Sequence, residues 1–244
     1  MKFNKEVFAI YLILLVLFAT MVIAVGFNSV TVVTPTADTN ISGSTLFNVT
    51  VANPDGLANA TNATFQFINY NTGALANNIT VDPSDAFNDT FNVTINTNTF
   101  LTDGQYNLTV NVTNSTGTTQ VVNSSITNIT VDNTAPSIIS FNNPSAGDNF
   151  SSDNQILNVT TTDATTAVFS VAFNLTNGTA DTLYIASNVA GSNDWNYTIN
   201  TSSYNEGSQT LTVWAIDTLL NNNNSESVSL TIDRTAPTVA ILNS

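Results

Sequence analysis

The 244-residue chain contains no cysteine and no histidine, and its only basic residues are Lys2, Lys5 and Arg234. Without cysteine or histidine, Ser-His and Cys-His nucleophilic catalysis is impossible, and transition metals lack their nitrogen and sulfur ligands. With one basic residue beyond position 5, the chain cannot neutralise phosphates, which excludes nucleic acid as a partner. We therefore expect a protein that is not an enzyme.

Charge of either sign is scarce. Charged residues make up 8% of the chain and the formal net charge is −14, yet apolar residues reach 42%. That apolar fraction is enough for packed cores, so the chain is not a disordered polyanion. Its polar surface consists mainly of amides and hydroxyls, since the chain has 38 Asn and 40 Thr. The cores must form without disulfides, which domains of about 100 residues can do.

The asparagines are placed in a particular pattern. Nineteen of them begin an N-x-[S/T] triplet without proline, the acceptor pattern for N-linked glycan in exported proteins. Polar residues also recur at every second position of a half-exposed strand, but that alternation has no direction, and the reversed triplet [S/T]-x-N occurs only seven times. The excess predicts a glycosylated surface. The candidate sites are Asn40, Asn48, Asn59, Asn62, Asn78, Asn88, Asn92, Asn107, Asn111, Asn114, Asn123, Asn128, Asn149, Asn158, Asn174, Asn177, Asn196, Asn200 and Asn223.

The first 27 residues differ from the rest. Lys2 and Lys5 precede an apolar run over residues 7–25. The run is longer than a usual signal-peptide core and just meets the roughly 20 residues needed to cross a bilayer, while small residues near Ala24 offer a cleavage site. A cleaved signal peptide and a signal anchor in the membrane both remain open. Either alternative places the remainder of the chain outside the cell.

Beyond Gly26 the pattern predicts strands throughout. Runs such as residues 47–51 and 91–95 alternate apolar and polar side chains with period two, and turn residues separate the runs. No stretch shows an apolar stripe at helical spacing. We therefore predict an all-β fold.

The chain repeats itself. Residues 101–112 align with 204–215, and the two copies end in the related segments 129–136 (ITVDNTAP) and 230–237 (LTIDRTAP). The Ala-Pro pairs are 101 residues apart, a period that corresponds to one β-sandwich per repeat. We predict one domain over 28–134, a second over 135–234, and the first strand of a further repeat within 235–244.

The pattern L-x-D-G-x-Y-x-L-x-V, followed by a loop and V-D-x-T-A-P, resembles the Ig-like repeats of bacterial and archaeal surface proteins. The resemblance covers about residues 28–244. It implies tandem Ig-like Greek-key β-sandwiches, of the fibronectin-III or cadherin-like kind, joined head to tail as a spacer, adhesive module or envelope component. Tyr106 occupies the place of a tyrosine corner, whose hydroxyl bonds back to the preceding loop, whereas the second copy has Gln209 there.

Two sets of alternating side chains are predicted to face inward. The first set is Phe47, Val49, Val51, Phe65, Phe67, Phe91, Val93, Ile95, Leu108, Val110, Ile129 and Val131, and the second is Leu157, Val159, Phe169, Val171, Phe173, Trp195, Tyr197, Ile199, Leu211, Val213, Leu230 and Ile232.

Calcium is the one metal to consider, because oxygen-rich junctions between sandwiches can hold it. Asp132 and Asp233 lie at the repeat junctions and Asp217 near a loop end, with Asp103 and Asp163 in similar places. No D-x-D-x-D run is present, and turn or linker roles explain these residues equally well. Both interpretations remain open, and no other cofactor is expected.

These observations predict an exported, N-glycosylated protein of the cell surface, on a prokaryotic and more specifically archaeal envelope. It would act as a structural stalk or adhesion module, in contact with neighbouring Ig-like repeats and with other surface proteins or glycans. Two alternatives are a filament (pilus-like) or S-layer subunit and a carbohydrate-binding accessory module of a larger secreted enzyme.

Overall fold

The computed structural model describes residues 29–52, 60–84, 89–114, 119–176 and 183–239, with side chains left out for 114 and 119–125. The N-terminal run predicted as a signal peptide or anchor lies outside these residues. So do residues 240–244, which include most of the strand predicted near the C-terminus. Within the described ranges, no helix has the length and apolar character needed to cross a membrane.

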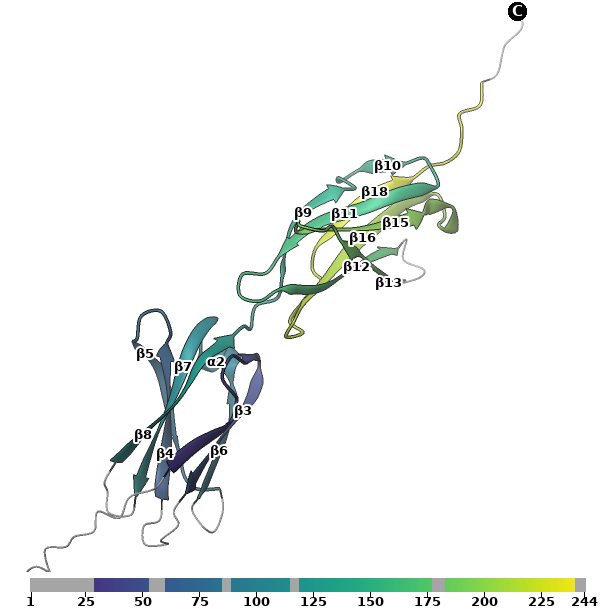
Figure 1. Ribbon diagram of the computed structural model, residues 1–244. Coiled ribbons are helices and arrows are strands. Elements are labelled where there is room, and N and C mark those ends of the chain that lie inside the picture. Colours follow the sequence, from purple (N-terminus) through teal and green to yellow (C-terminus); the bar gives the residue numbers. More distant parts are fainter. Residues whose placement is uncertain (1–28, 53–59, 85–88, 115–118, 177–182, 240–244) are drawn as a thin grey trace, which may run out of the picture.

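The first domain is a sandwich of two sheets. One sheet has the strand order β1-β3-β6 and the other β2-β8-β7-β4-β5, with β2 parallel to β8 and the other pairs antiparallel. The elements, drawn in Figure 1, are β1 (Ser29–Thr34), β2 (Asn40–Ile41), β3 (Ser44–Ala52), β4 (Ala60–Asn69), β5 (Leu75–Val81), β6 (Thr90–Asn96), α2 (Thr97–Phe100), β7 (Gly104–Asn114) and β8 (Thr119–Val131).

The second domain repeats this topology. Its sheets have the orders β9-β11-β15-β14 and β10-β18-β16-β12-β13, with β17 added beside β16 and β10 again parallel to β18. The fold class predicted from the sequence, all-β with tandem Ig-like sandwiches, is therefore confirmed. The elements are β9 (Ser137–Asn143), β10 (Asp148–Phe150), β11 (Asn154–Thr162), β12 (Val168–Thr176), β13 (Leu183–Ile185), β14 (Ser187–Asn188), β15 (Asp194–Asn200), η1 (Thr201–Ser203), β16 (Gly207–Asp217), β17 (Asn222–Asn223) and β18 (Ser227–Ile232).

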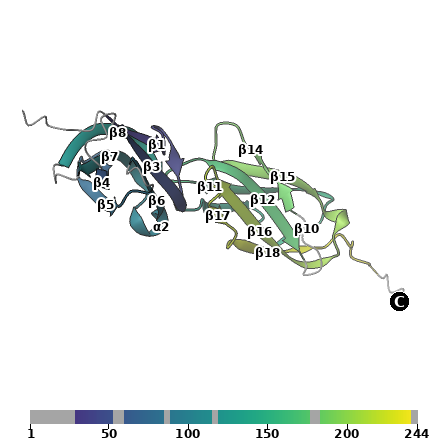
Figure 2. The ribbon, with the colours of Figure 1, turned by 90° about the horizontal axis from the view of Figure 1, so that it is seen from below.

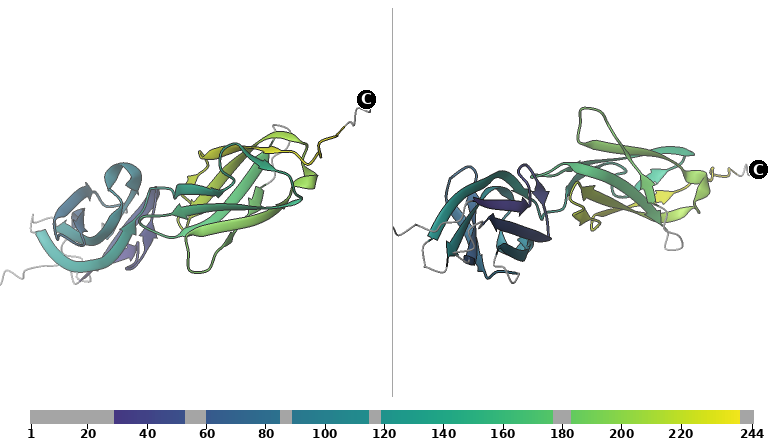
Figure 3. Two further views of the ribbon diagram at one scale, coloured as in Figure 1. Left: turned by 90° about the horizontal axis from the view of Figure 1, so that it is seen from above. Right: turned by 60° about the horizontal axis from the view of Figure 1, so that its bottom comes forward.

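The two sandwiches lie end to end (Figure 1). The view from below in Figure 2 and the views in Figure 3 show the same arrangement, with the chain passing once between the domains. The five residues from Asp132 to Pro136 make that connection between β8 and β9. The C-terminal segment leaves the second domain at the end remote from the first (Figure 1).

Each core is built from the alternating side chains. Nearly all the predicted inward positions are buried; Val93, Trp195 and Tyr197 are half-buried and pack against their cores. Phe169 was predicted to face inward, and this is wrong, because the side chain is 65% exposed. A bulge in β12 between Val168 and Ser170 shifts the register against β16, so Val168 packs against the core instead.

The two domains fasten the start of β7 and of β16 in the same way with different side chains. The Tyr106 hydroxyl donates to the backbone oxygen of Thr102 at 2.8 Å, which completes a tyrosine corner. In domain 2 the Gln209 amide nitrogen donates to the backbone oxygen of Asn205 at 2.9 Å, also four residues back. Glutamine therefore replaces the corner rather than abolishing it, although its Oε1 is buried without a partner.

A short helical turn precedes each corner, where the sequence predicted only strands and loops. Asn96 caps α2 and Asn200 caps η1, each accepting a hydrogen bond from the backbone two residues later. A side chain that accepts this bond satisfies a backbone N–H that a helix leaves free at its start. Such turns are too short to produce an apolar periodicity, so the sequence pattern did not reveal them.

The corner hydrogen bond should stabilise domain 1. We expect Tyr106→Phe to lower the free energy of unfolding by about 1 kcal/mol, because the hydroxyl and its hydrogen bond to the Thr102 carbonyl are removed while the ring stays in place. Denaturant titration followed by far-UV circular dichroism measures the change. Tyr70→Phe is the matched control, since the Tyr70 side chain is 49% exposed and its hydroxyl bonds to no described residue. Equal stability of both variants would contradict the assignment.

Candidate metal centre at the domain junction

The linker between the domains is held firmly by domain 1. Both carboxylate oxygens of Asp103 accept hydrogen bonds from it, one from the Asn133 backbone at 2.8 Å and one from the Thr134 hydroxyl at 2.5 Å. The Asp132 backbone N–H donates to the oxygen of Ile41 at 3.0 Å, which continues the parallel pairing of β2 and β8. The linker therefore extends domain 1 and presents Asp132 to domain 2.

Domain 2 binds this linker through side chains of two loops. The Thr166 hydroxyl donates to Asp132 Oδ2 at 2.6 Å, and the Asn221 amide donates to the backbone oxygen of Asp132 at 3.0 Å. Asn221 also accepts from the Ser42 hydroxyl of domain 1 at 2.9 Å. These bonds join two domains across sequence separations of up to 179 residues. The junction is thus an ordered contact as well as a covalent link.

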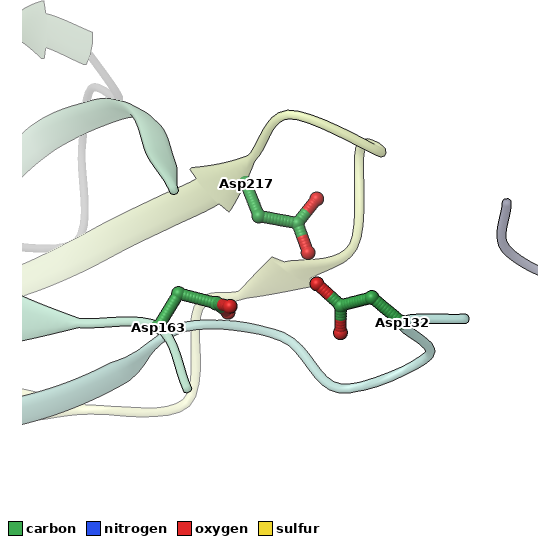
Figure 4. A group of neighbouring side chains, drawn as sticks. All are labelled: Asp132, Asp163 and Asp217. Atoms are coloured by element: carbon green, nitrogen blue, oxygen red, sulfur yellow. The ribbon is translucent and has the colours of Figure 1, made fainter. Parts of the chain in front are cut away.

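Three carboxylates converge at this contact (Figure 4). One ligand oxygen from each of Asp132, Asp163 and Asp217 lies within 4.8 Å of the other two. Asp132 comes from the linker, Asp163 from the loop after β11, and Asp217 from the end of β16. Asp132 and Asp217 are 0% exposed. Burial of like charges this close together is costly unless a proton or a cation neutralises them.

No basic side chain compensates the group among the described residues. Arg234 is the only basic residue of the described ranges, and its guanidinium donates to the backbone oxygen of Tyr204, beyond η1 at the far end of domain 2. Burial raises the pKa of Asp132 above its ordinary value of 3.8, and repulsion by Asp163 and Asp217 acts in the same direction. Hydrogen bonds from Thr166 and Thr134 lower that pKa but do not overcome the burial.

The carboxylates also have local roles. Asp163 Oδ1 accepts from the backbone of Thr165 at 2.9 Å and of Thr166 at 2.7 Å, and Asp217 Oδ1 caps its own loop in a similar way. Asp217 Oδ2 also accepts from the Asn221 amide at 2.8 Å, so local hydrogen bonds involve both oxygens of Asp217 and one of Asp163. The turn interpretation accounts for these bonds but does not explain why three such carboxylates meet.

The group has the chemistry of a calcium site. Calcium binds oxygen ligands at about 2.3–2.6 Å, so two ligands of one ion are at most about 5 Å apart. The three carboxylates satisfy that limit, and their oxygens suit a hard cation rather than a transition metal. Asp132, Asp163 and Asp217 are the residues that would hold it.

The other acidic candidates lie elsewhere. Asp233 is exposed at the far end of domain 2, where it corresponds to Asp132, and Asp103 holds the linker. Asp163 is part of the group although only its position near a loop end suggested it, since nothing in the sequence shows that β11 ends beside the linker. Asp163 also borders an open pocket of about 510 Å³ that Asn188, Asn193 and Trp195 help to line.

Fourteen of the nineteen candidate glycosylation sites have described side chains. No described sequon asparagine is buried. Five are exposed and nine are half-buried; Asn59, Asn88 and Asn177 lie outside the described residues, and Asn114 and Asn123 are described for the backbone only. The exposed sites are Asn40, Asn78, Asn92, Asn149 and Asn200, and the half-buried sites are Asn48, Asn62, Asn107, Asn111, Asn128, Asn158, Asn174, Asn196 and Asn223.

Comparison with known proteins agrees with the fold. Residues 193–244 match the family model of the bacterial Ig-like domain (group 3). A marsupial T cell receptor is similar with a TM-score of 0.54 and 11% identity, over 86% of this chain and 76% of the receptor chain. The fibronectin(III)-like modules of Clostridium thermocellum CbhA have 17% identity and a TM-score of 0.40, over 87% of this chain and 100% of theirs.

A bacterial ice-binding adhesin is also similar, with 16% identity and a TM-score of 0.35 over 85% of this chain and 64% of the adhesin chain. No curated protein matches the sequence. The match to the T cell receptor, with a TM-score of 0.54 at 11% identity, shows a shared fold alone. The sandwich architecture of both described domains is of the Ig-like type, and the family model supports this for residues 193–244.

Proposed function

We propose that the protein is a glycosylated stalk module of the cell surface, in which rigid Ig-like domains are joined end to end by carboxylate-centred junctions. One observation carries this proposal. The end of domain 1 that contacts domain 2 has a structural equivalent at the far end of domain 2. A chain whose successive domains end in the same docking groups is suited to extension by further domains of the same kind.

The repetition extends to individual hydrogen bonds. Asp233 donates through its backbone N–H to the oxygen of Phe150 at 3.0 Å, as Asp132 does to Ile41. Glu206 accepts from the Arg234 backbone at 3.0 Å and from the Thr235 hydroxyl at 2.6 Å, which is the role of Asp103 in domain 1. These hydrogen bonds lower the pKa of Glu206, and the bond from the Thr235 hydroxyl has the largest effect.

The docking groups themselves are exposed at this second end. Three residues of domain 1 and the linker contact domain 2. Ser42 does so through its hydroxyl, and Asp132 through its carboxylate and its backbone carbonyl. The carbonyl of Pro136 accepts a hydrogen bond from Asn223 at 3.0 Å. Their counterparts Ser151, Asp233 and Pro237 are all exposed. The partner that fits them is another Ig-like domain whose loops supply the equivalents of Thr166, Asn221 and Asn223.

Glycosylation and export complete the proposal. Five of the described sequon asparagines are exposed, so sugar can be added there without disturbing either core. Such a coat would provide the solubility that the 8% of charged residues does not. The N-terminal apolar run supports passage across the membrane on sequence grounds.

We further propose that the junction carboxylates bind calcium. A divalent cation would neutralise the buried like charges of Asp132, Asp163 and Asp217, and it would favour the arrangement in which the two domains are docked. The cation would therefore stiffen the stalk in a calcium-containing medium. This proposal concerns the junction only, and a stalk without calcium remains compatible with the hydrogen bonds described above.

Rigidity depends on the bonds that domain 2 makes to Asp132. We expect Thr166→Val to loosen the junction, because the variant keeps the side-chain shape and removes a charge-assisted hydrogen bond worth about 1.5–3 kcal/mol. Nuclear magnetic relaxation should then show that the two domains tumble more independently. Small-angle X-ray scattering should show a broader distribution of end-to-end distances of the molecule. Thr165→Val is the matched control, since only the backbone of Thr165 bonds to Asp163. Identical behaviour of the two variants would reject the stalk mechanism.

Calcium binding can be measured directly. We expect titration calorimetry to show one site per chain with a Kd of about 10⁻⁴–10⁻³ M, the range of extracellular calcium modules. Asp163→Asn should weaken binding at least about tenfold, since it removes charge from the group while its Oδ1 can still cap the loop. Asp233→Asn, at the other end of domain 2, should bind like the wild type. Absence of heat or thermal stabilisation at millimolar calcium would rule the site out.

A proton competes with the cation for Asp132, which gives a pH dependence. A carboxyl whose pKa is raised by folding binds its proton more tightly when folded, so its contribution to stability is greatest below 3.8 and is lost as the pH rises through the raised pKa. In chelator, we expect the wild type to lose stability relative to Asp132→Asn across that interval. Added calcium should reduce or reverse the loss, because calcium binds the deprotonated form. Parallel stability profiles of wild type and variant would contradict this account.

A further inference from the structure

Two pairs of sequon asparagines face each other across neighbouring strands. Asn48 on β3 is the register partner of Asn92 on β6, and Asn158 on β11 is the register partner of Asn196 on β15. The strand orders β1-β3-β6 and β9-β11-β15 make β3 equivalent to β11 and β6 to β15. Each domain therefore carries the same pair of candidate sites on the outer face of the same sheet.

The spacing of such a pair is too small for two glycans. Side chains opposite each other on antiparallel strands have Cβ atoms about 4.5–5.5 Å apart and point the same way. In N-glycosylation, the asparagine Nδ2 loses a proton and forms a bond to the anomeric carbon of a glycosyl diphosphate, and the bond from that carbon to the phosphate oxygen breaks. Each transfer places a sugar ring directly on the amide. Two rings on opposing amides would occupy the same space above the sheet.

In domain 1 the surroundings favour Asn92. It is exposed and lies on β6, which is an edge strand of its sheet among the described residues. Its amide nitrogen donates one hydrogen bond to Ser84 Oγ at 3.1 Å. The second amide hydrogen is the one that transfer replaces. Asn48 is half-buried on the central strand β3, and its Oδ1 is enclosed without a hydrogen-bond partner. A sugar on Asn92 would bring hydroxyl donors to that oxygen.

In domain 2 the surroundings favour Asn196. Asn158 is held in a polar network, in which it accepts from the Asn142 amide at 2.7 Å. The hydroxyl of Thr160, the third residue of the Asn158 sequon, donates to Asp194 at 2.5 Å and accepts from Asn142. The Asn196 side chain makes no hydrogen bond with any described residue. Exposure and the edge position therefore favour β6 in domain 1, whereas in domain 2 the half-buried Asn196, on a strand paired with both β14 and β11, is favoured by its unbonded side chain alone.

We propose that each cross-strand pair carries a single glycan, on Asn92 in domain 1 and on Asn196 in domain 2, while Asn48 and Asn158 stay unmodified beneath it. This inference rests on the glycosylation proposed above and specifies its pattern. One glycan would recur at the same place in each domain, so the sugar coat would repeat with the period of the sandwiches.

The test is the joint occupancy of the two members on one molecule. Mass spectrometry of the native protein, on fragments that keep residues 44–96 or 154–200 intact, measures it. We expect molecules with both members modified to be at least about tenfold rarer than the product of the two single occupancies, because crowding opposes the second transfer or the folding of its product. Asn78 and Asn92, exposed sites on different sheets within the fragment 44–96, are the control pair and should be occupied independently.

A variant separates competition from a poor acceptor. We expect Asn92→Gln to raise the occupancy of Asn48, whereas Asn78→Gln, on the other sheet, should leave it unchanged. Three results would each overturn this inference while leaving the proposed sugar coat intact. The first is a joint occupancy equal to the product of the two single occupancies, and the second is unmodified paired sites beside modified control sites. The third is an Asn48 that stays unmodified in Asn92→Gln. A native protein with no glycan at any sequon would overturn the proposed coat itself.

Discussion

The constraint on which this structure depends is the alternation of side chains along its strands. Without disulfides and with few charges, each sandwich is held together by the apolar side chains that its two sheets bury between them. The same alternation leaves every second position free to face outward. Asparagine and threonine occupy those positions, so the residues that stabilise the core and the residues that form the surface come from the same strands.

The junction applies the opposite principle, since it buries charge rather than apolar surface. Asp132 leaves the last strand of domain 1 and enters the contact with domain 2, where Thr166 and two further carboxylates meet it. A buried carboxylate is costly to leave without partners, which makes the contact selective for a domain that supplies the right donors. In the stalk proposed above, the need to neutralise this group would link the stiffness of the junction to protons and to divalent cations.

Both domains reach the same geometry with different residues. A tyrosine in one domain and a glutamine in the other make the corner bond, and an aspartate in one and a glutamate in the other hold the following linker. What the repeats share is therefore the position of a donor or acceptor rather than its identity. The shared topology, including the parallel pairs β2–β8 and β10–β18, keeps these positions equivalent.

The sequence alone determined the strand periodicity, the two repeats with their common ending, the inward faces and the outward asparagines, because all of these follow from local alternation and spacing. It also indicated Asp132, Asp217 and Asp233 as candidate calcium ligands, of which Asp233 lies away from the group. Only the tertiary structure decided that Phe169 faces outward, that Asp163 completes the carboxylate group, and that Asn48 and Asn158 face other sequons. These features depend on bulges and on the register between strands. Hydrogen bonds between segments that are distant in the sequence set that register, so a local sequence pattern does not reveal it.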